Sequence, residues 1–518
     1  MAVWLPPEGV IERGGNTRVS LGMIDGGDFR CPAADAMTAR GARPAVNTDR
    51  KYEVLEDFTG AMFMAELDRR RESGEADLVR TRPAHDGLRQ WTTHALAMYE
   101  KAFPENPLEP LIETARPWVY RYRPETGEKS QRTEMQITAW GRCLQSPDGS
   151  RRELRLPVNR LDGRLRDESY RAVAALVAAE GAPGPRPVYI RVVRFAMEDG
   201  QIDPIFDGTR QAALELHRTA GKPAIASLLD SREYRPGSAC VKCRFAAVCP
   251  ELRQLPGLLG LSDTSRPRRS WSATNGTSYE ACAARDHIRR HHLPTAISIE
   301  RSQSAERGRA LHAFLKTAHS LRPFTPCSVS LPVEWVPDRF TLTEAERDLG
   351  ALLLRRHAAV CPLWRAQTAE SLKPEPRLVF HDTAADVIVI AEPDLLYLDH
   401  GSWVWREVKT AASDRRWWRD PVRKYPQLAL AVLIITRGGL GESRTRPRIE
   451  LEVLRPGGAD LLTIDPFLPS VREAAEARIL GLVREWHRDD TFAARTGSEC
   501  LKCEVAQWCS ACTGKAAL

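Results

Sequence analysis

Two short cysteine-rich segments have the spacing of metal-binding sites. One reads CVKCRFAAVC at residues 240–249 and the other reads CLKCEVAQWC at residues 500–509, so both follow the pattern C-x2-C-x5-C. Three thiols at this spacing can converge on one metal centre, the usual intracellular use of clustered cysteines, whereas redox sensing is the less favoured alternative. Because the pattern occurs twice, we expect two metal clusters. Their ligands would include Cys240, Cys243 and Cys249 in the first and Cys500, Cys503 and Cys509 in the second.

A second set of reactive side chains lies on two apolar segments of the second half. Residues 385–399 read ADVIVIAEPDLLYLD, which predicts a buried strand or strand pair that carries Asp394. The segment WVWREVK at 403–409 predicts another strand, in which Glu407 and Lys409 share one face because side chains alternate. Buried carboxylates are costly unless they are paired or bind a cation. A neighbouring strand that brings the aspartate beside these two residues would therefore create a site for Mg²⁺ or Mn²⁺.

The order of these residues resembles the RecB-like branch of the PD-(D/E)XK nucleases that carries an iron–sulfur cluster. Asp394 follows a proline and is succeeded by Glu407-Val408-Lys409, which matches the signature of these nucleases. Upstream, His312 in RGRALHAFL matches the histidine that this branch carries on a helix. Histidine, acid pair and lysine occur in the expected order.

Two further features extend the resemblance over residues 271–512. Gln427 in YPQLALA matches the glutamine of the QxxxY helix, but Ala431 stands where the tyrosine is expected, which leaves Tyr425 as a candidate substitute. Cys282, followed far downstream by the second cysteine triplet, matches the split four-cysteine pattern of the CRISPR-adaptation and AddB-type nucleases. The departure at the tyrosine affects DNA positioning rather than the metal site.

The resemblance implies a role for each residue of this set. Lys409 would orient or activate the attacking water, and Gln427 would belong to the catalytic residues. Glu375 is a weaker candidate for a supporting acid. One or two Mg²⁺ or Mn²⁺ ions would be bound by His312, Asp394, Glu407 and the carbonyl of Val408.

The resemblance also implies one or two [4Fe–4S] clusters. In the second half the cluster would be held by Cys282, Cys500, Cys503 and Cys509, although Cys512 leaves open a purely local zinc site. The corresponding ligands of the first half would be Cys31, Cys240, Cys243 and Cys249, and they would bind either an iron–sulfur cluster or a zinc ion. Either cluster would hold the N-terminal and C-terminal ends of its unit together.

The loop at residues 409–424, KTAASDRRWWRDPVRK, combines basic and aromatic side chains. Such a combination suits phosphate contacts and base stacking on single strands. A solvated loop whose tryptophans pack into the core is the equally weighted alternative. The candidate nucleic-acid contacts are Arg415, Arg416, Trp417 and Trp418.

The two halves of the chain align as an internal repeat. Within that alignment Arg142 falls on Asp394 and Arg155 falls on Glu407, so the first half keeps no carboxylate pair for a metal. An arginine such as Arg142 could instead bind a phosphate directly. We therefore expect a degenerate nuclease domain at residues 1–255, a linker at 256–270 and an intact nuclease domain at 271–518.

Composition limits the class of protein. The chain has 518 residues, 42% of them hydrophobic and 28% charged, which excludes wholesale disorder, and its net charge of +7 permits a nucleic-acid partner. We expect a cytoplasmic protein without membrane segments, because neither a secretory signal nor an apolar run of spanning length is visible. Without a G-x-x-x-x-G-K-[ST] loop, any motor or targeting function would belong to a partner protein.

The expected fold is α/β, with two restriction-endonuclease-like units, each a mixed sheet flanked by helices and closed by a cysteine-ligated metal cluster. The expected activity is a metal-dependent DNA nuclease, acting on single-stranded or end-containing DNA in defence, CRISPR adaptation or DNA repair. The alternative is a catalytically inactive nucleic-acid-binding scaffold with structural metals, and a third option is a zinc-binding interaction protein.

Overall fold

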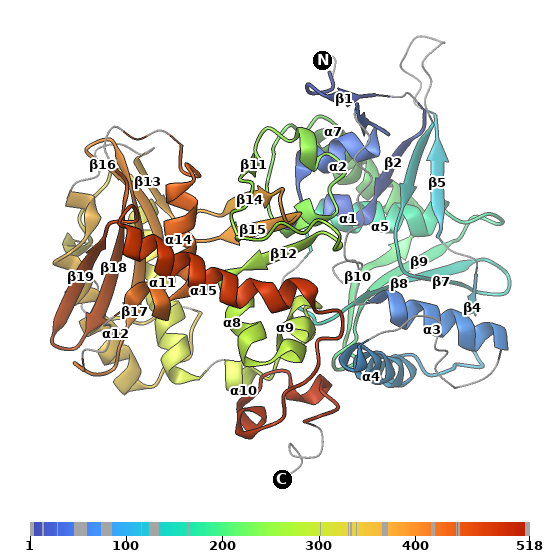
Figure 1. Cartoon of the computed structure of the whole chain (residues 1–518). Helices are drawn as coiled ribbons and strands as arrows, with labels where there is room; N and C mark the ends of the chain where they lie inside the picture. The colour runs from blue at the N-terminus through green and yellow to red at the C-terminus, as the bar shows by residue number, and fades with distance from the viewer. Residues whose placement is uncertain are drawn as a thin grey trace. The chain divides into compact units, whose positions relative to one another are not determined.

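The computed structural model divides the chain into two compact units (Figure 1). The first comprises Met1–Glu251, Ile288–Pro294 and Trp508–Ser510, and the second comprises Leu252–His287, Thr295–Gln507 and Ala511–Leu518. The residues that the structure describes are 5–12, 15–27, 29–45, 60–73, 85–114, 117–123, 134–163, 166–300, 302–329, 331, 334–337, 339–364, 371–415, 420–441, 443 and 446–512.

The first unit combines helices with three β-sheets. Its strands are β1 (Val10–Ile11), β2 (Thr17–Ser20), β3 (Arg43–Pro44), β4 (Ile112–Glu113), β5 (Val119–Tyr122), β6 (Met135–Thr138), β7 (Arg142–Gln145), β8 (Arg151–Val158), β9 (Tyr189–Ala196) and β10 (Ile202–Thr209). Its α-helices are α1 (Leu21–Ile24), α2 (Pro32–Ala39), α3 (Gly60–Ser73), α4 (Asp86–Ala102), α5 (Glu168–Glu180), α6 (Arg210–Leu216) and α7 (Lys222–Leu229). Shorter helical turns are η2 (His217–Gly221), η3 (Ser238–Val241) and η4 (Ala246–Val248).

The second unit combines helices with two β-sheets. Its strands are β11 (Arg253–Gln254), β12 (Arg269–Ser272), β13 (Leu372–Pro374), β14 (Leu378–Asp382), β15 (Val387–Ala391), β16 (Leu395–Asp399), β17 (Ser402–Thr410), β18 (Arg448–Arg455) and β19 (Gly458–Ile464). Its α-helices are α8 (Ala273–Ala281), α9 (Ala283–Arg290), α10 (Ile297–Glu300), α11 (Gln303–Ser320), α12 (Glu344–Ala358), α13 (Pro421–Lys424), α14 (Pro426–Thr436) and α15 (Pro469–Arg488). Shorter 3-10 turns are η5 (Cys327–Val329), η6 (Pro362–Trp364), η8 (Ser498–Lys502) and η9 (Ala506–Trp508).

The main sheets of the two units have the same topology. The strand order is β10-β9-β8-β7-β4 in the first unit and β19-β18-β17-β16-β13 in the second. In both, the central pair is parallel, β8 with β9 and β17 with β18, and the other pairs are antiparallel. A helical connection joins each parallel pair, as a parallel pairing requires: it contains α5 in the first unit and the short α13 followed by α14 in the second.

The smaller sheets repeat the correspondence. In the first unit β2 runs parallel to β6, which is antiparallel to β5, and in the second unit β12 runs parallel to β15, which is antiparallel to β14. The strand β11 extends only the second of these sheets, by pairing parallel to β14. The two units are therefore two versions of one chain path.

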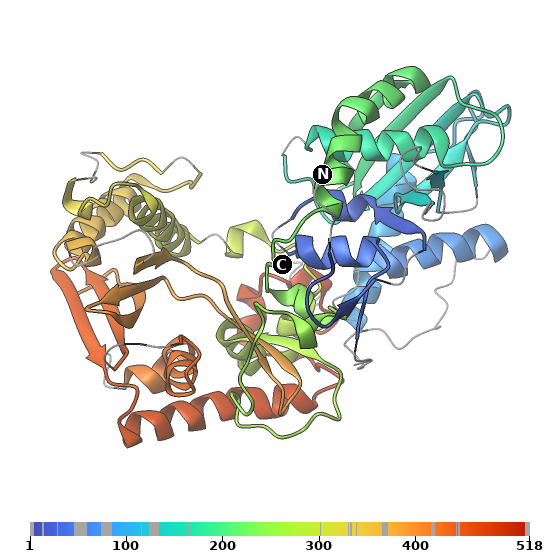
Figure 2. The ribbon, with the colours of Figure 1, turned by 90° about the horizontal axis from the view of Figure 1, so that it is seen from above.

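The main sheet of the second unit is covered by helices on both faces (Figure 2). Helices α11 and α12 lie over one face, where Val408 of β17 and Leu454 of β18 join their apolar side chains in one core cluster. Helix α14 lies on the other side and is buried along almost its whole length, because its sequence from Leu428 to Ile435 is apolar all round. A helix of this kind is stable only between other layers of the structure.

Residues 252–272, which include the expected linker, lie within the second unit. Gly257 and Leu259 donate their backbone N–H groups to the carboxylate of Asp382 at 2.7 and 2.8 Å, and Leu258 is buried. The segment ends in β12, which enters the smaller sheet.

The prediction of an α/β protein with mixed sheets is confirmed. In the part of the chain that the structure describes, no helix is both long enough and apolar enough to cross a membrane.

Candidate active site and metal centres

Four side chains predicted to form the catalytic site lie together in the second unit. The Nδ1 atom of His312, on α11, is 3.0 Å from Oδ1 of Asp394. The Nζ atom of Lys409 is 3.1 Å from Oε2 of Glu407 and 4.0 Å from Oδ2 of Asp394. The backbone N–H of Val408 donates to the other oxygen of Asp394 at 2.6 Å. Residues up to 97 positions apart thus form one cluster of two carboxylates, an imidazole and an ammonium group.

The strand register explains this convergence. Strands β16 and β17 are antiparallel, and their pairing places Leu395 opposite Arg406. The residue before β16, Asp394, therefore lies next to Glu407, the residue that follows Arg406. Alternation along β17 puts Lys409 on the same face as Glu407. Trp405, also on this face, donates its indole N–H to Glu407 at 3.0 Å and fixes the carboxylate.

Burial and charge act in opposite directions on the two carboxyl groups. Glu407 is 2% exposed, and this burial raises its pKa in spite of the nearby Lys409. Burial also opposes ionisation of Asp394, but the hydrogen bond with His312, the charge of Lys409 and the N–H of Val408 together lower its pKa. Asp394 is therefore the more readily ionised acid, and a bound cation would favour ionisation of both.

The donor set fits a divalent cation that prefers oxygen and nitrogen. Carboxylate oxygens from Asp394 and Glu407, the imidazole of His312 and the adjacent Val408 carbonyl suit Mg²⁺ or Mn²⁺. The side chains of His312 and Lys409 are 28% and 26% exposed, whereas Glu407 closes the interior side of the cluster.

Tyr425, directly before the expected glutamine helix, lies near the cluster. The Nζ atom of Lys409 is 5.9 Å from the centre of the Tyr425 ring, and the buried Tyr425 hydroxyl has no hydrogen-bond partner within the described part of the chain. Gln427 is half-buried in the first turn of α14. Glu375 donates its N–H to the carbonyl of Asp394 at 3.1 Å, but its carboxylate pairs with Lys316 at 2.8 Å.

The sequence from 270 to 510 matches the family described as the PD-(D/E)XK nuclease superfamily. The second unit contains a PD-(D/E)XK nuclease superfamily domain. No curated protein matches the chain. Among solved structures, the protein SSO0001 matches with 15% identity and a TM-score of 0.28, covering 47% of this chain and 86% of its own. A protein from Eubacterium rectale described as "Putative exonuclease" matches with 11% identity and a TM-score of 0.28, covering 48% and 88%. At these TM-scores the two structures add no argument to the family match.

The predicted nucleic-acid contacts of the nuclease domain are described only in part. Arg415 is exposed, five residues after the end of β17. The predicted contacts at Arg416, Trp417 and Trp418 lie outside the described residues.

The cysteines of the two predicted clusters have matching backbone surroundings. In the nuclease domain the N–H of Arg495 donates to Sγ of Cys282 at 3.4 Å, and in the first unit the N–H of Arg235 donates to Sγ of Cys31 at 3.4 Å. The turns agree as well. Cys503 donates its N–H to the carbonyl of Cys500, and Cys243 donates its N–H to the carbonyl of Cys240, each at 3.3 Å. Hydrogen bonds to sulfur of this kind are typical of metal-bound thiolates.

The thiols of each cluster also interact electrostatically. Burial and the charges of Cys240, Cys31 and Cys249 raise the pKa of Cys243 to about 12. Burial, Glu504 and Cys282 raise the pKa of Cys503. A shared cation is the usual way to offset such repulsion among thiolates. Within the described part of the chain, however, neither set of cysteines has its sulfur atoms all within 4.8 Å of one another, so the two metal clusters stay predictions.

The first unit has basic residues where the nuclease domain has acids. Arg142 and Arg155 are paired across β7 and β8, in the same relation as Asp394 and Glu407. Arg142 is 2% exposed and pairs with Asp68, at 2.6 Å, and with Glu113. A phosphate that binds Arg142 would have to displace one of these carboxylates.

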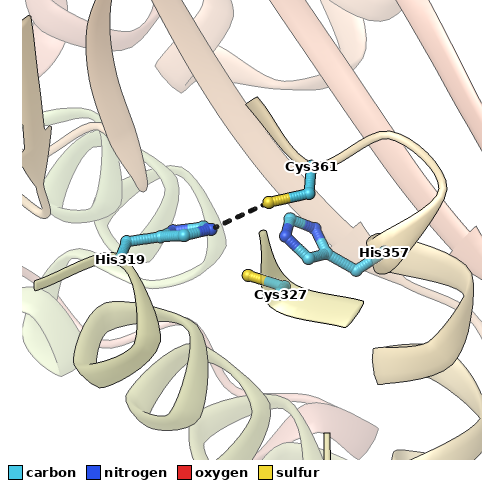
Figure 3. Close-up of side chains that lie close together, drawn as sticks. All are labelled: His319, Cys327, His357 and Cys361. Carbon is cyan, nitrogen blue, oxygen red and sulfur yellow. Dashed lines mark hydrogen bonds between the residues drawn. The ribbon is translucent and has the colours of Figure 1, made fainter. Parts of the chain in front are cut away.

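The structure brings together a further cluster that the sequence did not predict (Figure 3). Two histidines and two cysteines of the nuclease domain, all buried, each offer a ligand atom within 4.8 Å of the others and could hold a metal ion: His319, Cys327, His357 and Cys361. Their separations along the chain are irregular, since His357 follows Cys327 by 30 residues, and the cysteines do not form a C-x2-C motif. The sequence contains only a weak signal for this site. Cys327 and Cys361 lie outside both cysteine triplets, and Cys361 follows His357 by four residues.

Proposed function

We propose that the second unit is a metal-dependent deoxyribonuclease whose active site comprises His312, Asp394, Glu407 and Lys409. The observation that carries the proposal is the convergence of these four side chains inside a domain matched to a nuclease superfamily. Asp394, Glu407, His312 and the Val408 carbonyl would bind Mg²⁺ or Mn²⁺. When bound, the ion lowers the pKa of a water ligand and neutralises charge on the scissile phosphate.

The protein residues position the reacting groups. Asp394 is oriented by the Val408 N–H and by His312, so its free lone pairs are directed into the cluster. The ammonium group of Lys409, held by Glu407, can orient the attacking water and stabilise negative charge on the phosphate. Tyr425 and Gln427 lie where they could align the nucleic-acid strand.

We infer that the first unit is a degenerate copy of the same nuclease domain and contributes to binding and assembly. The identical strand order and directions support common descent, and Arg142 and Arg155 at the acid positions support the loss of catalysis. Arg142 stays a predicted phosphate contact, and Arg415, Arg416, Trp417 and Trp418 stay predicted contacts for single-stranded DNA.

We also propose a [4Fe–4S] cluster in each unit. The electrostatic interactions among these thiols and the N–H donors to sulfur support the proposal. The ligands would be Cys31, Cys240, Cys243 and Cys249 in one unit and Cys282, Cys500, Cys503 and Cys509 in the other. The clusters would be structural, because their ligands come from both ends of each repeat.

Cleavage of end-labelled single- and double-stranded DNA by the anaerobically purified chain, with Mg²⁺ or Mn²⁺, tests the activity. Glu407→Gln should abolish cleavage while leaving the fold intact. Glu392→Gln is a matched control, because Glu392 is an exposed carboxylate of the same segment that pairs with Arg377. DNA binding without metal-dependent cleavage would favour the inactive scaffold instead.

A further inference from the structure

The histidine–cysteine cluster of the nuclease domain is assembled from four separate segments. His319 lies at the end of α11, Cys327 begins the turn η5, His357 lies near the end of α12, and Cys361 directly precedes η6. Figure 3 shows the two imidazole rings and the two sulfur atoms directed toward a common centre. The Nε2 atom of His319 lies 4.0 Å from Sγ of Cys361.

The histidine on α12 has a nitrogen available for a metal. Its Nδ1 atom lies 2.6 Å from Oε1 of Glu452, a fully buried carboxylate on β18. In a neutral ring this hydrogen bond places the proton on Nδ1 and leaves Nε2 as an acceptor for a metal ion. The Nε2 atom of His357 is buried and has no hydrogen-bond partner within the described part of the chain. A carboxylate behind a metal-binding histidine is the usual outer partner at zinc sites.

The ligand types and their spacing fit one tetrahedral ion. With Zn–S distances near 2.3 Å and Zn–N distances near 2.0 Å, tetrahedral geometry separates the ligand atoms by about 3.3 to 3.8 Å. The observed limit of 4.8 Å among the four atoms therefore needs only a small contraction. Two thiolates and two imidazoles are soft and borderline ligands, which favour zinc over Mg²⁺ or Mn²⁺.

The surroundings fit a structural ion rather than a catalytic one. Both cysteines belong to an apolar cluster with Ala318, Leu363 and Tyr397, and all four candidate ligands are buried. Four protein ligands complete a tetrahedron, so no coordination position remains for water or substrate.

We propose that His319, Cys327, His357 and Cys361 bind one structural Zn²⁺ ion, which fastens α11 and α12 to the face of the main sheet that carries Val408 and Glu452. The ion would tie the ends of both helices to η5 and to the start of η6. It would lie outside both predicted iron–sulfur clusters, whose cysteines it does not share.

Two connections lead from this ion to the proposed active site. His312 precedes His319 by seven residues on α11, so both imidazoles lie on nearly the same helix face about two turns apart. On the other side, Glu452 also accepts a hydrogen bond from Arg406 at 3.2 Å, and Arg406 directly precedes Glu407 in β17. The zinc proposal does not depend on the nuclease proposal, but it makes the ion a positioning element for His312.

Metal analysis of the anaerobically purified full-length chain tests the proposal. We expect about one zinc per chain in the wild-type protein and in Cys143→Ser, a control at a buried cysteine of the first unit. The double variant Cys327→Ser/Cys361→Ser should lose this zinc and keep its iron. A zinc content of the double variant equal to that of the wild-type protein would overturn the proposal, as would a wild-type protein without zinc after growth in zinc-supplemented medium.

Two measurements on the wild-type chain keep the test decisive if the double variant is insoluble. Replacement of zinc by Co²⁺ should give the visible bands of tetrahedral, thiolate-ligated cobalt. A Cys327–Cys361 disulfide found by peptide mapping of unreduced protein would instead overturn the zinc site. Removal of the zinc should lower the melting temperature of the chain by about 5 to 10 °C, and added Zn²⁺ should restore it.

The zinc proposal and the nuclease proposal fail separately. Glu407→Gln should keep its zinc while losing cleavage, because Glu407 lies on the other face of β17. An active protein without zinc would refute the ion alone, whereas a zinc-bound, inactive wild-type protein would refute the nuclease alone.

Discussion

The two main sheets share a topology and carry opposite charges at the same two positions. In the second unit these positions hold Asp394 and Glu407, and in the first unit they hold Arg142 and Arg155 on the equivalent paired strands. In the first unit, carboxylates of the same unit neutralise both arginines. Arg142 pairs with two carboxylates, and Arg155 pairs with Glu153 at 2.5 Å. The backbone frame is thus independent of the site chemistry, provided that each buried charge finds a local partner.

The helices that flank the sheets show the same contrast. The second unit presents His312 from α11, whereas the repeat places the buried Met64 of α3 at that position. The lysine of the second unit also falls on a proline, Pro157, in the first. Every polar group of the proposed catalytic cluster is therefore absent from the first unit at the aligned positions, which makes the comparison testable residue by residue.

The largest expected effect is on catalysis in the second unit. Lys409→Ala should reduce DNA cleavage by about a thousandfold or more, because it removes the group that orients water and stabilises the phosphate charge. DNA affinity and thermal unfolding should change little. Lys373→Ala, at an exposed lysine of β13, is the control, and cleavage by Lys409→Ala at the control's rate would contradict the proposed site.

The next effect tests whether both units kept their metal clusters. Cys243→Ser and Cys503→Ser should each remove about four of about eight irons per chain, if both clusters are cubane. Iron determination together with visible absorbance of anaerobic protein measures this. If Cys243→Ser keeps all of the iron, the first unit has no iron–sulfur cluster, and the cluster, like the acids, is present only in the second unit.

A smaller effect separates a structural from a DNA-binding role for the first unit's arginine. Arg142→Met should lower the free energy of unfolding by about 3 kcal/mol, because it leaves Asp68 and Glu113 without their buried partner. Denaturant unfolding measures this loss, with Arg151→Met, at an exposed arginine paired to Glu109, as the control. Weakened DNA binding at unchanged stability would instead support the predicted phosphate contact.

The smallest effect concerns the tyrosine beside the catalytic lysine. Tyr425→Phe should slow cleavage by about five- to tenfold, because its partnerless hydroxyl is available to a water or a phosphate, and one hydrogen bond is worth about 1 kcal/mol. The internal repeat places Tyr170 of the first unit on Tyr425, and the matched change Tyr170→Phe should leave cleavage unchanged. Equal effects from the two variants would argue against a role for Tyr425 at the site.

Local patterns were sufficient for the α/β class and for the strands that carry the acids. Alternation and apolar runs depend only on neighbouring residues, so the strand at 402–410 and the common face of Glu407 and Lys409 follow from the sequence. The alignment of the two halves likewise identified the positions that exchange acids for arginines. The partners of those arginines could not be predicted, because Asp68 and Glu113 are brought to Arg142 by α3 and β4.

The histidine–cysteine cluster was decided by the tertiary structure alone. Its members lie on two helices and two turns, and their convergence requires α11 and α12 to pack together on one face of the sheet. Neighbouring thiols such as those at 500–509 reveal a metal site because the chain itself brings them close. Residues as far apart as His319 and Cys361 acquire that proximity only through packing, and no local pattern records it.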